Sequence, residues 1–392
     1  MYNQHAFDLG SNSCCIRELA EYGARRAAIV GKENILDFTI GNPSLPAPRE
    51  VTEAMTQILQ MDPLAVHSYT PAVGELATRQ AIADDLNARF GTDVQPDELF
   101  IGCGASPELV AVFQALAFPG AQILTLAPFF TEYRPFVESA GAQLVIVPPD
   151  IPDFQINLAQ VEALLTANTA AIIINSPNNP AGTVYTEQTL RALSALLQRK
   201  AAEFGHPIYI VSDDPYRELT YDGVTAPFIP TIYPDTIVCY SYSKSLSLPG
   251  ERIGYIYVPR QAADSKAVYT AISGAARAIG HICAPAIWQK VIAKCAHLRP
   301  DLTMYDQNRR ALLEGLTDAG YQVAKPDGAF YLFVRAPGGD SKAFSQKAME
   351  KDLLIVPGDD FGCPEYFRMC YCVSFEKIQK SLPVFRELIS EF

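Results

Sequence analysis

The stretch SYSKSLSLPGER, residues 241–252, indicates both the chemistry and the fold of this chain. It ends an apolar run at Ser241, places Lys244 among hydroxyl side chains and reaches Arg252 eight residues after the lysine. A lysine amine can form a Schiff base with an aldehyde cofactor. Hydroxyl groups such as that of Ser243, together with an arginine, can bind a phosphate. The stretch therefore predicts a site for a phosphorylated aldehyde.

Composition narrows the class of protein. The chain has 392 residues, of which 49% are hydrophobic and 19% charged, as expected for a globular protein of about two domains. Its net charge of −12 argues against nucleic acid and anionic membrane surfaces as partners. No apolar run is long enough for a membrane span, and the N-terminus lacks a signal pattern. Nine cysteines without a CxxC pair indicate free thiols and a cytoplasmic location, and five scattered histidines predict no metal site.

Apolar runs alternate with helical patterns between about residues 48 and 290. This alternation predicts an α/β domain with a mainly parallel sheet covered by helices on both faces. The expected strands are Phe100–Gly102, Gln122–Leu126, Gln143–Val147, Ala170–Asn175, Ile208–Ser212, Thr236–Ser241 and Gly254–Val258. The expected helices include Ser106–Ala117, Tyr133–Ala140, Leu158–Leu165 and Glu187–Phe204.

The C-terminal part has a different pattern, which predicts a smaller α+β domain. Its expected helices are Thr303–Ala319, Ser341–Lys351 and Lys380–Ser390. Its expected strands are Ala329–Val334 and Tyr371–Ser374.

Polar residues follow several of the expected strands. Because ligands of open α/β sheets bind beyond the carboxyl ends of the strands, we expect these residues to share one pocket. Asp213 directly follows an apolar strand, where a carboxylate would keep the ring nitrogen of pyridoxal phosphate protonated. Asp214 competes for this role on position alone. Tyr216 and Asn179 can bind the phenolic oxygen of the same cofactor and tune the pKa of its Schiff base.

Two further motifs fit this cofactor. Gly104, Ala105 and Ser106 open a helix, where backbone amides and the helix dipole favour a phosphate. Phe130 can stack on the pyridine ring, although a core phenylalanine is an equal interpretation of that residue.

These motifs together resemble the class I/II aminotransferases, which are fold-type I pyridoxal-phosphate enzymes. The resemblance runs from Ile16 to Tyr371, and the spacing around Lys244 is highly specific. It implies that Lys244 carries the cofactor. It also favours Asp213 over Asp214, because the family pattern Asp-x-x-Tyr puts Tyr216 in register. The roles of Asn179, Phe130, Ala105 and Ser106 agree with this family pattern.

The resemblance implies further roles. Arg368 matches the arginine that binds the substrate carboxylate, and Gly41 matches a glycine whose backbone lies beside it. Tyr69 matches a tyrosine that reaches the phosphate in the neighbouring subunit, which implies a homodimer with shared active sites. The implied domains are a large cofactor-binding domain over residues 48–290 and a small domain built from residues 1–47 and 291–392.

The predicted activity is transfer of the amino group from an L-amino acid to a 2-oxo acid. We expect aspartate and 2-oxoglutarate as candidate substrates. A dicarboxylate requires a second cation for its distal carboxylate, for which Arg17, Arg134 and Arg277 are available.

Two other functions remain as alternatives. A β-lyase on the same scaffold is disfavoured because a tryptophan often follows the Asn-Pro-x-Gly turn in such relatives, whereas the only tryptophan here is Trp288. A non-catalytic sensing module is disfavoured because only about 40 residues precede the first strand–helix unit and the chain is acidic.

Overall fold

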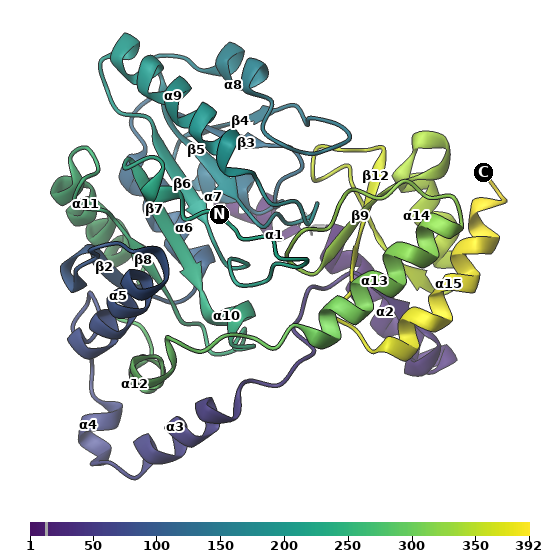
Figure 1. Ribbon diagram of the computed structural model, residues 1–392, viewed down its shortest axis with the longest axis horizontal. Coiled ribbons are helices and arrows are strands. Elements are labelled where there is room, and N and C mark those ends of the chain that lie inside the picture. Colours follow the sequence, from purple (N-terminus) through teal and green to yellow (C-terminus); the bar gives the residue numbers. More distant parts are fainter. Residues whose placement is uncertain (12–14) are drawn as a thin grey trace.

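A seven-stranded sheet forms the centre of the computed structural model, which describes residues 1–11 and 15–392 (Figure 1). Every predicted strand of the sheet forms, with ends within one residue of those expected. In spatial order the strands are β2 (Leu99–Gly102), β8 (Gly254–Tyr257), β7 (Thr236–Ser241), β6 (Tyr209–Asp213), β5 (Thr169–Asn175), β3 (Gln122–Leu126) and β4 (Gln143–Val147).

The strands run parallel except for β8, which is antiparallel to both neighbours. The prediction of a mainly parallel sheet is therefore confirmed. Between β7 and β8 the lysine stretch forms the short helix α10 (Tyr242–Ser245), and Ser241 caps this helix by accepting a hydrogen bond from the Ser243 amide. Lys244 is thus held on a short turn at the carboxyl end of β7.

Alternate residues of the strands serve different cores. In β5, Ala171 and Ile173 pack on one face, whereas Ile172 and Ile174 pack on the other. The first face is covered by α6 (Ala105–Leu116), α7 (Tyr133–Ser139) and α11 (Ser265–Ala278). The second is covered by α8 (Leu158–Leu164) and α9 (Glu187–Phe204), and near β2 by α3 (Arg49–Leu59), α5 (Leu76–Phe90) and α12 (Ala286–Cys295). Helices on both faces bury the sheet, as predicted.

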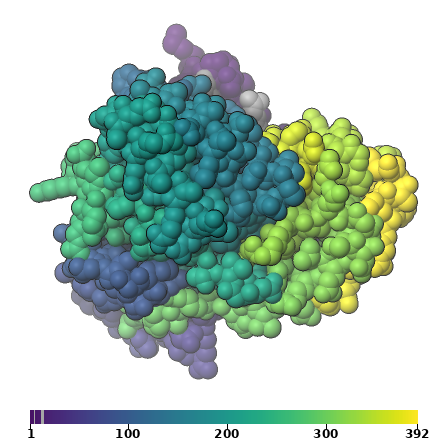
Figure 2. All heavy atoms as spheres, turned by 45° about the horizontal axis from the view of Figure 1, so that its top comes forward, coloured from purple at the N-terminus to yellow at the C-terminus, as the bar shows by residue number. Residues whose placement is uncertain are grey.

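The C-terminal part builds a separate core beside the sheet (Figures 1 and 2). Its antiparallel sheet has the order β11 (Val356–Pro357), β12 (Tyr366–Cys370) and β9 (Tyr331–Arg335). A parallel pair joins β1 (Leu36–Asp37) to β10 (Leu353–Leu354). The remaining helices are α1 (Gln4–Ser11), α2 (Cys15–Val30), α4 (Pro63–His67), α13 (Thr303–Asp318), α14 (Ser341–Glu350) and α15 (Phe375–Ile389).

One predicted strand was wrong. A strand was expected at Tyr371–Ser374, but the strand lies earlier, at Tyr366–Cys370, where it pairs with β9. Arg368 interrupts the apolar pattern of this strand and so hides it in the sequence. The following segment instead leads into α15, because the hydroxyl of Ser374 accepts a hydrogen bond from the Lys377 amide and caps the helix. The helix therefore begins five residues before the predicted Lys380.

The predicted division into two domains stays a prediction. Leu36 and Phe38 pack in the same core as residues of α13, β9 and α15, which agrees with an N-terminal contribution to the small domain. The helix α12 runs through the predicted boundary at residue 290 and packs on α3 and α5.

None of the helices in the described parts of the chain is both long and apolar enough to cross a membrane. Within the same residues, no cluster of three or more histidine, cysteine, aspartate or glutamate side chains has an arrangement suited to a metal ion.

Candidate active site

A cavity of about 280 Å³ lies where the ends of the central strands meet the C-terminal part. It brings together all predicted site residues except Gly104 and Tyr69. The predicted residues that line the cavity are Gly41, Ala105, Ser106, Phe130, Asn179, Asp213, Tyr216, Ser241, Ser243, Lys244, Arg252 and Arg368. The strand ends predicted to converge do so, because β5, β6 and β7 are parallel neighbours.

Asp213 is the buried acid of this cavity, with 5% of its surface exposed. Its Oδ2 accepts a hydrogen bond of 2.5 Å from the hydroxyl of Tyr133, and the side-chain amide of Asn175 donates to its backbone carbonyl at 2.8 Å. Its Oδ1 has no hydrogen-bond partner among the described residues. Burial raises the pKa of Asp213 to about 7, although the Tyr133 hydroxyl opposes this rise. The site thus leaves one carboxylate oxygen for a donor that enters the cavity.

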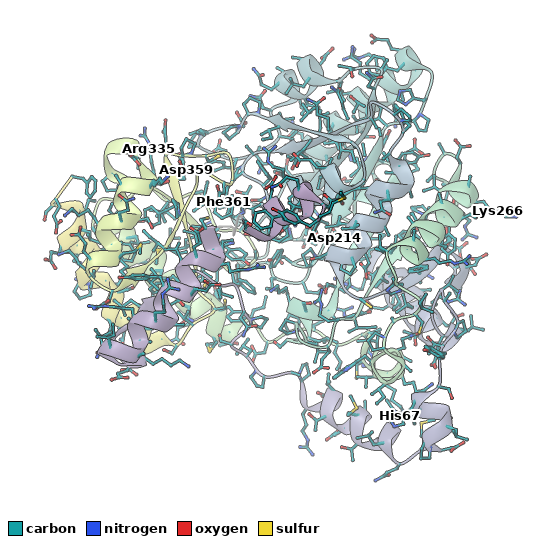
Figure 3. The ribbon with its side chains drawn as sticks, turned by 180° about the vertical axis from the view of Figure 1, so that it is seen from behind. His67, Asp214, Lys266, Arg335, Asp359 and Phe361 are labelled. Atoms are coloured by element: carbon teal, nitrogen blue, oxygen red, sulfur yellow. The ribbon has the colours of Figure 1, made fainter. Side chains whose placement is uncertain are left out.

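Asp214, the competing acid, has a different environment. Arg217 donates to its Oδ2 at 2.6 Å, and the hydroxyl of Ser212 donates to its Oδ1 at 2.6 Å. Asp214 is absent from the cavity wall and lies in the sheet-containing part of the molecule (Figure 3). The acid that faces the cavity is therefore Asp213.

Lys244 supplies the amine. Its Nζ donates a hydrogen bond of 2.8 Å to the carbonyl of Gly41 and lies 5.4 Å from the centre of the Phe330 ring. Burial lowers the pKa of Lys244 to about 8, and the positive charges of Arg368 and Arg252 act in the same direction. A substantial fraction of the amine is therefore neutral, and hence nucleophilic, just above neutral pH.

Polar groups gather beside the N-terminus of α6. The hydroxyls of Ser241 and Ser243 lie 2.7 Å apart, and Nη1 of Arg252 donates to the Ser243 hydroxyl at 3.3 Å. Gly104 has a left-handed φ of 86°, and a Cβ there would lie 2.8 Å from Nη2 of Arg252. Glycine at this position leaves room for the guanidinium of Arg252, and the amide end of the helix and this guanidinium create a site for an anion.

A second guanidinium in the wall of the cavity comes from the C-terminal part. Arg368 is 2% exposed and donates to Oδ1 of Asn179 at 3.0 Å and to the carbonyl of Thr39 at 2.5 Å. Its guanidinium carbon lies 4.8 Å from the ring centre of Tyr331 and 5.2 Å from that of Phe361, which belongs to the C-terminal part (Figure 3). Its Nε has no partner among the described residues. This buried guanidinium is oriented by its neighbours and suits a second anion.

The family model for class I and II aminotransferases matches residues 33–383. The chain belongs to this family. It is 30% identical to the aspartate aminotransferase of Thermotoga maritima, over 94% of this chain and 95% of that protein. It is also 30% identical to the aspartate/prephenate aminotransferase of Thermus thermophilus, over 91% of each.

Solved structures agree with this assignment. A crystal structure of an aminotransferase from Eubacterium rectale has 49% sequence identity and a TM-score of 0.98, covering 100% of this chain and 99% of that one. The Thermus thermophilus aspartate aminotransferase with maleate has 27% identity and a TM-score of 0.83, covering 96% and 97% of the two chains. The protein is therefore a transaminase of fold type I that acts on amino acids and 2-oxo acids.

Aminotransferases of this class use pyridoxal phosphate, and the residues of the cavity fit this cofactor. Oδ1 of Asp213, which no described residue binds, can accept a hydrogen bond from a protonated ring nitrogen. The positive charge of that nitrogen would also offset the cost of burying the carboxylate. The amine of Lys244 can react with the aldehyde of the cofactor, and the anion site at α6 can bind its phosphate.

Three contributors to the aminotransferase site were not predicted. Tyr133 and Asn175 position Asp213, and the hydroxyl of Tyr331 lies 2.9 Å from that of Tyr216. Tyr133 and Asn175 lie within predicted elements, but nothing in their spacing reveals their partners. Tyr331 lies in the run GAFY, inside the expected strand Ala329–Val334, and its contribution to the site can be recognised only when β9 is placed beside the cavity.

Two sets of predicted residues lie apart from the cavity. The side chain of Tyr69 is exposed on the surface of this single chain, at 91%. Arg17 and Arg134 line a second hollow between α2 and α7, and Arg277 is exposed in the last turn of α11. None of these three arginines lines the main cavity.

Proposed function

We propose that Lys244 carries pyridoxal phosphate and transfers protons during transamination. The observation that carries this proposal is the presence, in one cavity, of a lysine with a pKa of about 8 and a buried aspartate with a free Oδ1. The bound cofactor supplies an electron sink for the substrate α-carbon. Once an incoming amino acid has released it from the cofactor, the neutral amine of Lys244 would move the proton from the substrate α-carbon to the cofactor carbon C4′, and general acid–base catalysis of this kind speeds a step by about 10²- to 10⁴-fold.

The other residues of the cavity bind and orient. Asp213 holds a proton on the ring nitrogen, and Phe130 covers the ring. Ser241, Ser243 and Arg252 hold the phosphate, together with the amides of Ala105 and Ser106. Tyr216 and Asn179 bind the phenolic oxygen. The positions of all these side chains in one cavity support these roles.

We infer that Arg368 binds the α-carboxylate of the substrate and that the Gly41 backbone lies beside it. The hydrogen bonds from Arg368 to Asn179 and Thr39 hold the guanidinium in place before the substrate arrives. A carboxylate there would meet the free Nε and share the remaining donors in charge-assisted hydrogen bonds.

Aspartate is the donor that we propose to test first, with 2-oxoglutarate as acceptor. The names of the Thermotoga and Thermus relatives support this choice. The arginines in the wall of the cavity are Arg252 and Arg368, to which we assign the phosphate and the α-carboxylate, and the wall also contains the apolar residues Ile16, Ile40 and Leu109. A distal carboxylate would therefore need a cation from a second chain.

A homodimer is our proposal for the assembly. The exposed side chain of Tyr69 supports it, as do exposed apolar side chains in the same N-terminal part, namely Ile40, Leu59, Met61, Leu64 and Leu76. Light scattering should give twice the mass of the 42.9 kDa chain, and a monomer that is fully active would contradict shared active sites.

The visible absorption spectrum of the purified protein tests the function. We expect a yellow band that single amino acids convert to a stable pyridoxamine-type spectrum without any oxo acid. A donor panel of aspartate, glutamate, phenylalanine and leucine then defines the side-chain preference. Persistence of the band together with release of ammonia would indicate a lyase, and absence of any band after adding pyridoxal phosphate would contradict the proposed role of Lys244.

A further inference from the structure

Tyr331 is a buried tyrosine at the junction of the cavity walls. It lies in β9, is 2% exposed and lines the cavity. Its hydroxyl lies 2.9 Å from the hydroxyl of Tyr216, a hydrogen-bond distance, although the two residues are 115 positions apart in the chain. This contact connects the segment after β6 with the C-terminal sheet.

The same side chain touches the other functional groups of that wall. The guanidinium carbon of Arg368 lies 4.8 Å from the centre of its ring. A Cβ on Gly41 would overlap the Tyr331 hydroxyl, so only glycine allows this close approach. The carbonyl of Gly41 in turn accepts the hydrogen bond from Lys244. Tyr331 therefore contacts the residue proposed for the phenolic oxygen, the carboxylate-binding arginine and the loop that holds the lysine.

The hydrogen bond between the two tyrosines has a direction once a cofactor is bound. Burial raises the pKa of both Tyr216 and Tyr331, so each keeps its single hydroxyl proton. A hydroxyl has one proton to donate. If Tyr216 donates that proton to an acceptor in the cavity, it must accept from Tyr331. A hydroxyl that accepts such a bond becomes a stronger donor, because linked hydrogen bonds polarise one another.

We propose that Tyr331 is a positioning residue that orients the Tyr216 hydroxyl as a donor into the cavity. The proposal rests on the proposed role of Tyr216 at the phenolic oxygen of the cofactor. A donor there withdraws negative charge from that oxygen, so the neighbouring Schiff-base nitrogen holds its proton less tightly. Tyr331 thereby lowers the pH at which the bound cofactor loses that proton.

The test is a pH titration of the visible absorbance of the enzyme loaded with pyridoxal phosphate. In Tyr331→Phe the ring remains beside Arg368 and only the hydroxyl is lost. We expect the midpoint to rise by about 0.4 to 1 pH unit, the size of one hydrogen bond. Tyr216→Phe should raise the midpoint further, and the double variant should match Tyr216→Phe alone, because Tyr331 acts only through Tyr216.

Tyr371→Phe is the matched control. Tyr371 is also fully buried, and its hydroxyl donates to the Ala329 carbonyl at 3.1 Å, outside the cavity wall. Its loss should leave the midpoint unchanged. A wild-type midpoint in Tyr331→Phe, or shifts that add in the double variant, would overturn the proposal while the function stands. A wild-type protein without a visible band would overturn the proposed function, and this inference with it.

Discussion

The charged groups in the two walls of the cavity differ in how far other residues hold them in place. On the wall built from strand ends, Asp213 keeps one oxygen without a hydrogen-bond partner among the described residues, and burial lowers the pKa of Lys244 to about 8. On the C-terminal wall, Arg368 is held by hydrogen bonds from two of its nitrogens and lies against two aromatic rings. In our proposal the first wall transfers protons and the second binds the substrate.

This difference teaches that burial can serve reactivity or affinity, depending on partners. Burial raises the pKa of Asp213, whose Oδ1 has no hydrogen-bond partner among the described residues, and lowers that of Lys244, which brings both groups near neutral pH. Burial with partners keeps Arg368 in one orientation, so little freedom is lost when a carboxylate binds. Changes on the first wall should therefore act mainly on kcat, and changes on the second mainly on KM.

The largest effect is expected for Lys244→Ala. Without the amine there is no group to carry the cofactor or move the proton, so kcat should fall by about 10⁴-fold or more. Steady-state kinetics measures the loss, and circular dichroism checks that the fold is retained. Lys266→Ala is the control, because Lys266 is an exposed lysine on α11 at the far edge of the molecule (Figure 3). Near-normal turnover in Lys244→Ala would contradict the proposed role of Lys244 in catalysis.

The next effect separates the two neighbouring aspartates. Asp213→Asn should lower kcat by about 10²- to 10³-fold, because a neutral side chain no longer stabilises a protonated ring nitrogen. Asp214→Asn instead breaks the buried ion pair with Arg217 and should lower the free energy of unfolding by about 3 kcal/mol or more. Kinetics and urea unfolding of both variants provide the measurement. Equal losses of kcat would show that the cavity-facing position of Asp213 has no special role.

A smaller effect is expected on the binding wall. Arg368→Lys keeps the charge but removes the planar guanidinium, so kcat/KM should fall by about 10- to 100-fold, chiefly through KM. Arg335→Lys is the control, because Arg335 ends β9 on the exposed side and pairs with Glu365 there (Figure 3). A fall in kcat with unchanged KM would place Arg368 in the chemical step instead.

The smallest effect concerns the pH dependence of cofactor capture. In the cofactor-free protein only the neutral amine of Lys244 reacts. Because burial lowers the pKa of Lys244 to about 8, the neutral fraction grows as the pH rises through that value. The capture rate, followed by visible absorbance, should rise about tenfold between pH 7 and 9 and then level off. A lysine with an ordinary pKa would give a rise in capture rate of about a hundredfold that continues above pH 9. That result would contradict a lowered pKa for Lys244.

Prediction from sequence succeeded where the relevant residues are contiguous. The apolar strands that end at Asn175, Asp213 and Ser241 were located within one residue, because strands covered on both faces are apolar throughout. It failed for the strand that carries Arg368, because a buried charge breaks the apolar pattern. It also missed Tyr331, because its hydroxyl partner, Tyr216, lies 115 positions away in the sequence.

The sequence by itself determined the chemical groups of this protein: a lysine among hydroxyls, the Asp-x-x-Tyr pair and the helix opening at Gly104. Each of these signals lies within a few residues, where local backbone geometry keeps the spacing. Only the tertiary structure decided that Asp213 faces the cavity with an oxygen that no described residue binds, while Asp214 pairs with Arg217. Only the packed strands bring Tyr331 to Tyr216, because solvent exclusion and long-range contacts exist only in the folded chain.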